Sequence, residues 1–295
     1  MAVNFFKKKI DTFDYDQQRS CKNCGHSYKG RFCNKCGQKV IESNERTVSY
    51  FIGHIFNAFT FVDGKFWNSV KSLILRPGQM SLDISEGKDR PYMKPVGLFF
   101  VGNLIYFLFP IFQTFDTNLY SQMDYMVYSD MLSISEIVEN RVALEGTSLE
   151  IFADKYANTS REISKTALIL FAIYFSLIIS LINFSRRKLF SDHILFGLEL
   201  SSFVIHYLTI LLGVVLWGMG LILSLFYDRV NLIRDDIFFF VAIPIFLYAL
   251  VRGIRTFYKV SWLVSSLKSL ISLVGLVISI ELYRLCVFAL TMLLL

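Results

Sequence analysis

Two short cysteine motifs set the strongest constraint on how this chain folds. Each has the form Cys-X2-Cys-Gly, and together they occupy residues 21–37. Four thiolates at this spacing can surround one zinc ion tetrahedrally, and such an ion can fold a segment that has no core of its own. We therefore predict a zinc-ribbon module over residues 1–45 with one structural zinc ion. The predicted ligands are Cys21, Cys24, Cys33 and Cys36.

Other chemistry for the cysteine quartet stays open at this point. Iron, disulfides and free thiols are the alternatives, and a reducing cytoplasm disfavours disulfides. His26 is a spare ligand candidate, but four cysteines already fill the shell. A closed shell leaves no coordination position for a substrate, which indicates a structural metal. Gly25 and Gly37 each follow the second cysteine of a pair, where a tight turn often needs a positive φ.

Long apolar runs follow the cysteine module. Hydrophobic residues make up 54% of the chain and charged residues 18%, a balance typical of a protein dissolved in lipid. Helices are the expected spanning elements, because lipid cannot hydrate the backbone. We predict an all-α integral membrane protein, a five-helix transmembrane bundle with an interfacial amphipathic helix. The predicted spans are about 96–114, 166–184, 194–226, 237–251 and 261–293 within a membrane domain of residues 95–295.

The distribution of charge predicts the sidedness of the chain. Residues 1–94 carry 16 Lys and Arg against 9 Asp and Glu, and basic turns follow the second and fourth predicted spans. The loop over residues 115–165 is acidic, with nine Asp and Glu against four Lys and Arg. By the positive-inside rule, the amino terminus is expected in the cytoplasm, and the acidic loop and the carboxyl terminus outside. The basic excess favours anionic lipid over nucleic acid, since no basic helix or aromatic ladder is present.

Residues 46–94 are predicted to lie at the membrane surface. Apolar residues recur at helical spacing over 47–75, and lysines interrupt the run, as in an amphipathic interfacial helix. Pro77-Gly78 ends this helix, and a cationic and aromatic collar follows before the first span. The predicted contacts to lipid headgroups are Arg76, Lys88, Arg90 and Lys94.

Polar residues recur every seven positions in the third predicted span. Seven helical steps advance about 700°, so these residues form one stripe along the helix. Ionisable groups rarely face lipid, and the stripe should therefore face the bundle or a wet cavity. Two interpretations remain open: an ion, proton or headgroup site, or a packing seam in which glycine allows close approach. The stripe contains Asp192, Glu199, His206, Gly213 and Gly220, and the predicted intramembrane polar site is Asp192, His193, Glu199 and His206.

The last span contains a second pair of charged residues. Glu281 and Arg284 are three residues apart and are predicted to form an intramembrane ion pair. Cys286 is expected to be a small apolar residue of the helix. We predict no catalytic residues, because no phosphate-binding loop, nucleophile with a histidine partner, or open metal site is recognisable.

Four segments of the chain resemble the domain-of-unknown-function 3667 family. They read CKNCGHSYKGRFCNKCGQK at 21–39, FTFVDGKFWNSVKSLILRPG at 59–78, EGKDRPYMKP at 86–95 and SDHILFGLELSSF at 191–203. The collar at 87–90 departs from the family pattern by one inserted residue. The resemblance implies a bacterial membrane protein with an amino-terminal zinc ribbon, and therefore the bacterial cytoplasmic (inner) membrane. It brings no activity with it.

Two functions follow from the sequence. The first is a non-enzymatic membrane protein that docks a cytoplasmic partner through its zinc ribbon and scaffolds or assembles envelope components. The alternative is a transporter or lipid-handling protein that uses the polar site of the third span. The expected partners are membrane lipids and a cytoplasmic or membrane protein, with a second copy of the chain as a further candidate and nucleic acid not expected.

Overall fold

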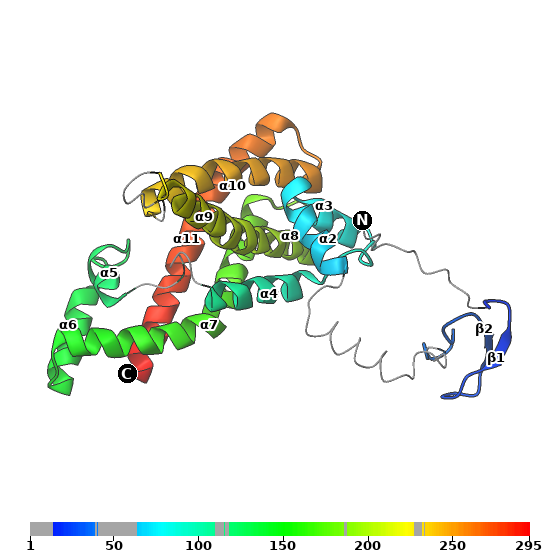
Figure 1. The fold of residues 1–295 in the computed structure, drawn as a ribbon, viewed down its shortest axis with the longest axis horizontal. Helices are drawn as coiled ribbons and strands as arrows, with labels where there is room; N and C mark the ends of the chain where they lie inside the picture. Colours follow the sequence, from blue (N-terminus) through cyan, green and yellow to red (C-terminus); the bar gives the residue numbers. More distant parts are fainter. Residues whose placement is uncertain are drawn as a thin grey trace. The chain divides into compact units, whose positions relative to one another are not determined.

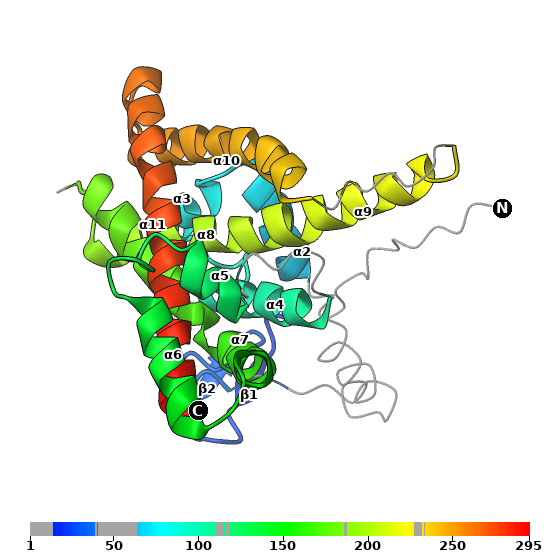
Figure 2. The ribbon, with the colours of Figure 1, turned by 90° about the vertical axis from the view of Figure 1, so that its left-hand side faces the viewer.

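The computed structural model divides the chain into two compact units, Met1–Phe61 and Val62–Leu295. Figures 1 and 2 show both units as ribbons coloured along the sequence. The structure describes residues 14–38, 40, 64–109, 115, 118–185, 188–226, 232 and 234–295.

The amino-terminal unit contains a small antiparallel hairpin. Strand β1 (Gln18–Ser20) pairs with β2 (Ser27–Lys29), and Arg19 lies opposite Tyr28. The buried side chains of the described part of this unit are those of Cys21, Tyr28 and Cys33. So small a cluster cannot offset the conformational entropy of folding these described residues, which therefore need a further source of stability.

The second unit consists, in its described part, of helices joined by turns and loops, without strands. Its longest helices are α7 and α11, and a π-helix, η2, joins α8 to α9. The helices are α2 (Gly64–Leu75), α3 (Gln79–Ser85), α4 (Pro95–Leu108), α5 (Leu119–Asp124), α6 (Ile134–Glu145), α7 (Leu149–Ile182), α8 (Phe190–Phe203), η2 (Val204–Leu211), α9 (Leu212–Leu223), α10 (Asp235–Tyr258) and α11 (Trp262–Leu294).

Four stretches of the second unit are long and apolar enough to cross a membrane: α7, the continuous run from α8 to α9, α10 and α11. They also expose large apolar side chains: Leu181 is 79% exposed, Phe240 82% and Leu267 64%. Apolar surface of this extent is costly in water and matches the lipid environment of a membrane. The predicted mostly helical fold with long apolar helices is confirmed at this level, with four helices of spanning length in the described chain.

The first predicted span, 96–114, differs from the others. Its described part is α4, whose 14 residues rise about 21 Å, less than the ~30 Å of a hydrocarbon core. Residues 110–114 of the prediction lie outside the described residues. The described chain therefore contains four helices of spanning length with α4 as a shorter apolar helix, and the predicted count of five is not confirmed.

Two further segments differ from their predicted extent. The second spanning helix begins at Leu149 rather than 166, because Ser148 caps a polar stretch that continues into the apolar run. The acidic segment 115–165 accordingly contains α5, α6 and the first half of α7, which share a small core around Val138 and Phe152. Of the predicted helix 47–75, residues 47–63 lie outside the described residues, and the remainder is α2.

Close helix contacts form the core of the second unit. Helix α7 packs against α8 and α11, and α10 packs against α11. The views of Figures 1 and 2 show α11 running steeply across α10 and the α8–α9 run. Glycines allow α8 and α11 to lie close to α7. A Cβ at Gly197 of α8 would lie 2.3 Å from the Cα of Ser176 in α7, and a Cβ at Gly275 of α11 would lie 2.6 Å from Ile178 Cγ2 in α7.

Helices α2 and α3 form a hairpin that packs against α8, and α3 also packs against α10. The turn between α2 and α3 is Arg76-Pro77-Gly78, and Gly78 has a φ of 80°. A Cβ at Gly78 would lie 2.5 Å from the backbone oxygen of Gly253 in α10. Only glycine satisfies both the left-handed conformation and this backbone contact.

We expect Gly78→Ala to destabilise the helical unit by about 2–5 kcal/mol, the sum of a left-handed alanine and a backbone clash. Gly87→Ala is the matched control, because Gly87 also has a positive φ but its Cβ would meet nothing within 4 Å. That control should lose only about 1–2 kcal/mol. Thermal unfolding in detergent compares the two, and equal losses would show that the Gly253 contact is not tight.

Candidate functional site

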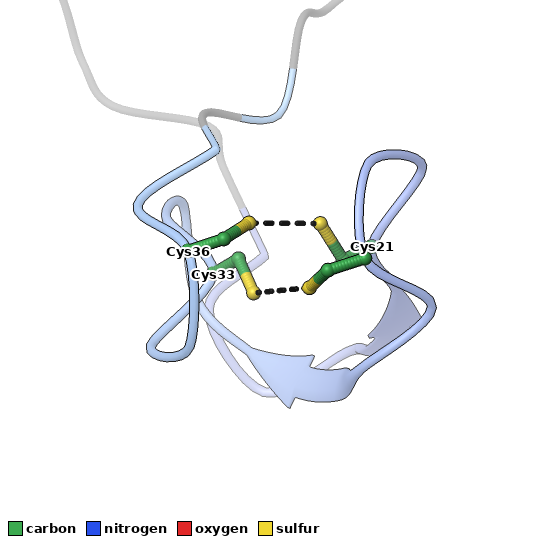
Figure 3. A group of neighbouring side chains, drawn as sticks. Cys21, Cys33 and Cys36 are labelled. Atoms are coloured by element: carbon green, nitrogen blue, oxygen red, sulfur yellow. Dashed lines mark hydrogen bonds between the residues drawn. The ribbon is translucent and has the colours of Figure 1, made fainter.

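The four cysteine sulfurs lie together at one end of the hairpin module (Figure 3). Their Sγ atoms all lie within 4.8 Å of one another, with 3.5 Å between Cys21 and Cys36 and 3.8 Å between Cys24 and Cys33. A tetrahedral zinc ion with Zn–S bonds of about 2.3 Å separates its sulfurs by about 3.8 Å. The spacing fits a tetrathiolate cage and is too long for S–S bonds of about 2.05 Å.

Matching backbone turns hold the two cysteine pairs. In the first motif, Cys21 N donates to His26 O at 2.9 Å and Gly25 N donates to Cys21 O at 2.8 Å. The predicted positive φ is confirmed, at 70° for Gly25 and 75° for the equivalent glycine of the second motif. The same bonds recur in the second motif at the same two lengths, from Cys33 N to Gln38 O and from Gly37 N to Cys33 O.

Backbone hydrogen bonds, burial and neighbouring thiols shift the pKa values of two of the cysteines in opposite directions. The backbone N–H of Gln38, with the side chain of Asn23, lowers the pKa of Cys36 to about 6. The backbone of His26 lowers the pKa of Cys24, but burial and the neighbouring thiols outweigh it and raise this pKa to about 12. Metal binding requires thiolates, so an ion bound here would displace the protons of these cysteines.

The donor set therefore fits a structural metal ion. Four thiolates leave a divalent cation with no open coordination position, so the chemistry supplied there is cross-linking of the chain rather than activation of water. The net charge of such a centre is negative, and exposed lysines at positions 22, 29 and 35 lie in the same module. The cysteine positions alone predicted this cluster.

The predicted intramembrane residue Glu199 is buried and fully engaged by the α2–α3 hairpin. One carboxylate oxygen accepts from Gly78 N at 2.8 Å, and the other accepts from Ser81 N at 2.8 Å and from the Ser81 hydroxyl. These donors lie at the start of α3, where free backbone N–H groups favour an anion. The carboxylate thus joins two parts of the fold and is not open to a substrate.

The other three residues of the predicted intramembrane polar site have different contacts. Asp192 accepts from Leu189 N at 3.1 Å and caps α8. His193 is fully buried, with Nδ1 2.8 Å from the hydroxyl of Tyr258. His206 Nδ1 lies 2.9 Å from the Ser202 carbonyl. The structure therefore does not bring the four residues into one site.

The four predicted contacts to lipid headgroups lie in the turn between α2 and α3 and in the collar between α3 and α4. Arg76 lines a hollow of about 270 Å³ that also contains Lys71 and Tyr92. The Tyr92 hydroxyl donates to Asp83 at 2.7 Å, and burial together with this carboxylate raises the pKa of Tyr92 to about 12. Lys88 pairs with Glu86 at 2.9 Å, and Arg90 and Lys94 are exposed.

The charged pair of α11 is present. Arg284 Nη1 lies 3.2 Å from Glu281 Oε1, and both side chains are less than one-fifth exposed. Cys286 lies on the same helix with Sγ 3.1 Å from the hydroxyl of Tyr174 in α7. The Glu281–Arg284 pair lies within α11, whereas the Cys286 contact joins α11 to α7.

Two features that determine where the residues of the predicted polar site lie could not be recognised in the sequence. The first is η2, whose π-helical turns change the register of the seven-residue stripe between His206 and Gly213. The second is Ser81, the partner of Glu199, which lies 118 residues away in the chain. The Pro77-Gly78 pair in the sequence indicated a turn. It did not indicate that this turn contacts Glu199 and Gly253.

A comparison with protein families finds a match in the first part of the helical unit. The model of a family described as "Protein of unknown function (DUF3667)" matches residues 63–107, which contain α2, α3 and most of α4. The resemblance predicted from the sequence motifs is therefore confirmed for this segment. No curated protein and no solved structure matches the chain.

We expect the purified chain to bind one zinc ion, and Cys33→Ser to lose most of it. Cys286→Ser is the matched control, because this cysteine lies in α11 and outside the module. Metal analysis by mass spectrometry after removal of loosely bound ions measures the zinc content per chain. Full zinc in Cys33→Ser, or iron in place of zinc, would contradict the assignment.

Glu199→Gln should destabilise the helical unit by about 1–3 kcal/mol. A carboxamide replaces one acceptor oxygen with a donor, so a buried backbone N–H of the α3 start loses its partner. Glu162→Gln, in an exposed pair with Lys165, should cost less than about 1 kcal/mol. Thermal unfolding in detergent compares the two variants, and similar losses would mean that the Glu199 contact is not important for stability.

Proposed function

We propose that this chain is a non-enzymatic, multi-pass protein of the bacterial cytoplasmic membrane whose module holds one structural zinc ion and docks a partner protein in the cytoplasm. The observation that carries this proposal is the closed four-sulfur cluster, in one chain with helices long and apolar enough to span a membrane. The role that follows is scaffolding or assembly in the envelope. A rigid, metal-held module suits recognition, because little conformational entropy is lost on binding.

The surface of the module supports a docking role. Phe32 is 58% exposed next to the buried ligand Cys33, and Tyr15 is 51% exposed. Exposed aromatic side chains on a rigid support are frequent anchors of protein interfaces. The lysines of the module add positive charge around them. The partner surface is therefore expected to be acidic, with an apolar pocket for Phe32.

The environment of Glu199 gives the transport hypothesis less support. Both carboxylate oxygens are occupied by donors of Gly78 and Ser81, so a substrate would have to displace α3 from the bundle. His193 is enclosed by aromatic rings, stacked between Phe184 and Tyr258. Neither group offers the open geometry that substrate binding requires.

Charged contacts at one end of the bundle support the cytoplasmic placement. Lys188, in the turn after α7, donates to Ser85 at 3.0 Å, and Lys259, at the end of α10, pairs with Glu86 at 3.7 Å. Two basic turns therefore meet at the carboxyl end of α3. Positive turns stay on the cytoplasmic side of the inner membrane, and this end is assigned there.

Co-purification from mild detergent tests the docking role. Proteins that bind the wild-type chain and Cys286→Ser should be lost from Cys33→Ser, which lacks a zinc ligand. Phe32→Ala, which leaves all four cysteines in place, should lose the same proteins while keeping its zinc. An unchanged set of bound proteins in both Cys33→Ser and Phe32→Ala would refute docking through the module.

A further inference from the structure

A hollow of about 490 Å³ lies at the turn between α10 and α11. It shares no lining residue with the hollow beside Arg76, and Glu199 is not among its lining residues. Both helices are long and apolar enough to span a membrane, and the hollow lies where α10 ends and α11 begins. Its lining residues are Tyr248, Val251, Arg252, Arg255, Thr256 and Trp262.

Two arginines give the hollow its charge. Arg252 and Arg255 are three residues apart on α10, so they lie on one face of the helix, and both are exposed. Among the described residues neither pairs with a carboxylate, whereas the nearby Lys259 pairs with Glu86. The Arg252 guanidinium donates to the Tyr248 hydroxyl at 2.8 Å, which orients it. The positive charge of the hollow is therefore not neutralised by the described chain.

Aromatic and apolar groups surround these cations. Trp262 is 60% exposed and Tyr248 is 54% exposed, as is typical of aromatic residues at the headgroup level of a membrane. Ile245 lies one turn before Tyr248 and seven residues before Arg252, and is 40% exposed. The same stripe of α10 thus passes from apolar surface to aromatic ring to guanidinium, the order in which a phospholipid presents its acyl chain, glycerol and phosphate.

We propose that this hollow binds the phosphodiester headgroup of an anionic phospholipid. Guanidinium groups present paired N–H donors that match phosphate oxygens, and Thr256, which also lines the hollow, adds a polar residue. Basic pockets between membrane helices on the cytoplasmic side are suited to such lipids. The inference rests on the membrane placement of the helices and is independent of the zinc module.

Native mass spectrometry of the full chain in detergent, titrated with phosphatidylglycerol, tests this site. Arg252→Gln/Arg255→Gln should raise the apparent Kd for phosphatidylglycerol at least about tenfold. The charge-matched control, Lys155→Gln/Arg234→Gln, removes two cations from exposed ion pairs elsewhere and should leave the Kd unchanged. The wild-type chain should bind phosphatidylcholine with the same acyl chains more weakly, because that headgroup has no net charge.

Three outcomes would overturn the proposal. They are an unchanged Kd in Arg252→Gln/Arg255→Gln, an equal loss in the control, and displacement of the lipid by free glycerol phosphate, which would make the ligand a soluble phosphate. If the double glutamine variant fails to fold, Arg252→Lys/Arg255→Lys replaces it, with an expected several-fold loss because lysine keeps the charge without the paired donors. Zinc content should stay at the wild-type level in every variant, which separates failure here from failure of the docking proposal.

Discussion

One buried carboxylate, that of Glu199, joins helix α8 to the turn between α2 and α3. Burying a charge is costly unless hydrogen bonds compensate it, and the backbone of Gly78 and Ser81 compensates that of Glu199 at the start of α3. The contact of Gly78 with Gly253 then fixes α10 against the same turn. The segment that matches the family model, 63–107, contains this turn. The described part of this segment therefore belongs to the core of the helical unit and is not a linker.

Local patterns made the metal cluster and most of the spanning helices predictable. Cysteine spacing predicts the cluster because the ligands lie within one short segment. Apolar runs predict α11 closely, whereas α10 continues seven residues beyond its predicted end because Arg252 and Arg255 interrupt the apolar run but not the helix. The partners of Glu199 could not be predicted, because the contact joins residues more than one hundred positions apart. Periodicity also failed where the backbone departs from the α-helix, as in η2, and where a polar stretch continues an apolar helix, as at the start of α7.

Positive charge connects the proposed roles. The basic turns that meet α3 and the arginine pair of α10 lie at neighbouring helix ends, and the cysteine module carries exposed lysines of its own. In the proposed arrangement, anionic lipid at this end would hold the helices against the inner leaflet, and the module would offer a basic, aromatic surface to a protein in the cytoplasm. Both roles require the same sidedness of the chain.

That sidedness is the central claim, and protease accessibility in spheroplasts tests it most directly. One tag is placed ahead of Met1 and another is inserted at the exposed turn Gly146, between α6 and α7. The account predicts that protease added outside cuts the tag at Gly146 and leaves the amino-terminal tag intact until the membrane is broken. Cleavage of the amino-terminal tag in intact spheroplasts would contradict it.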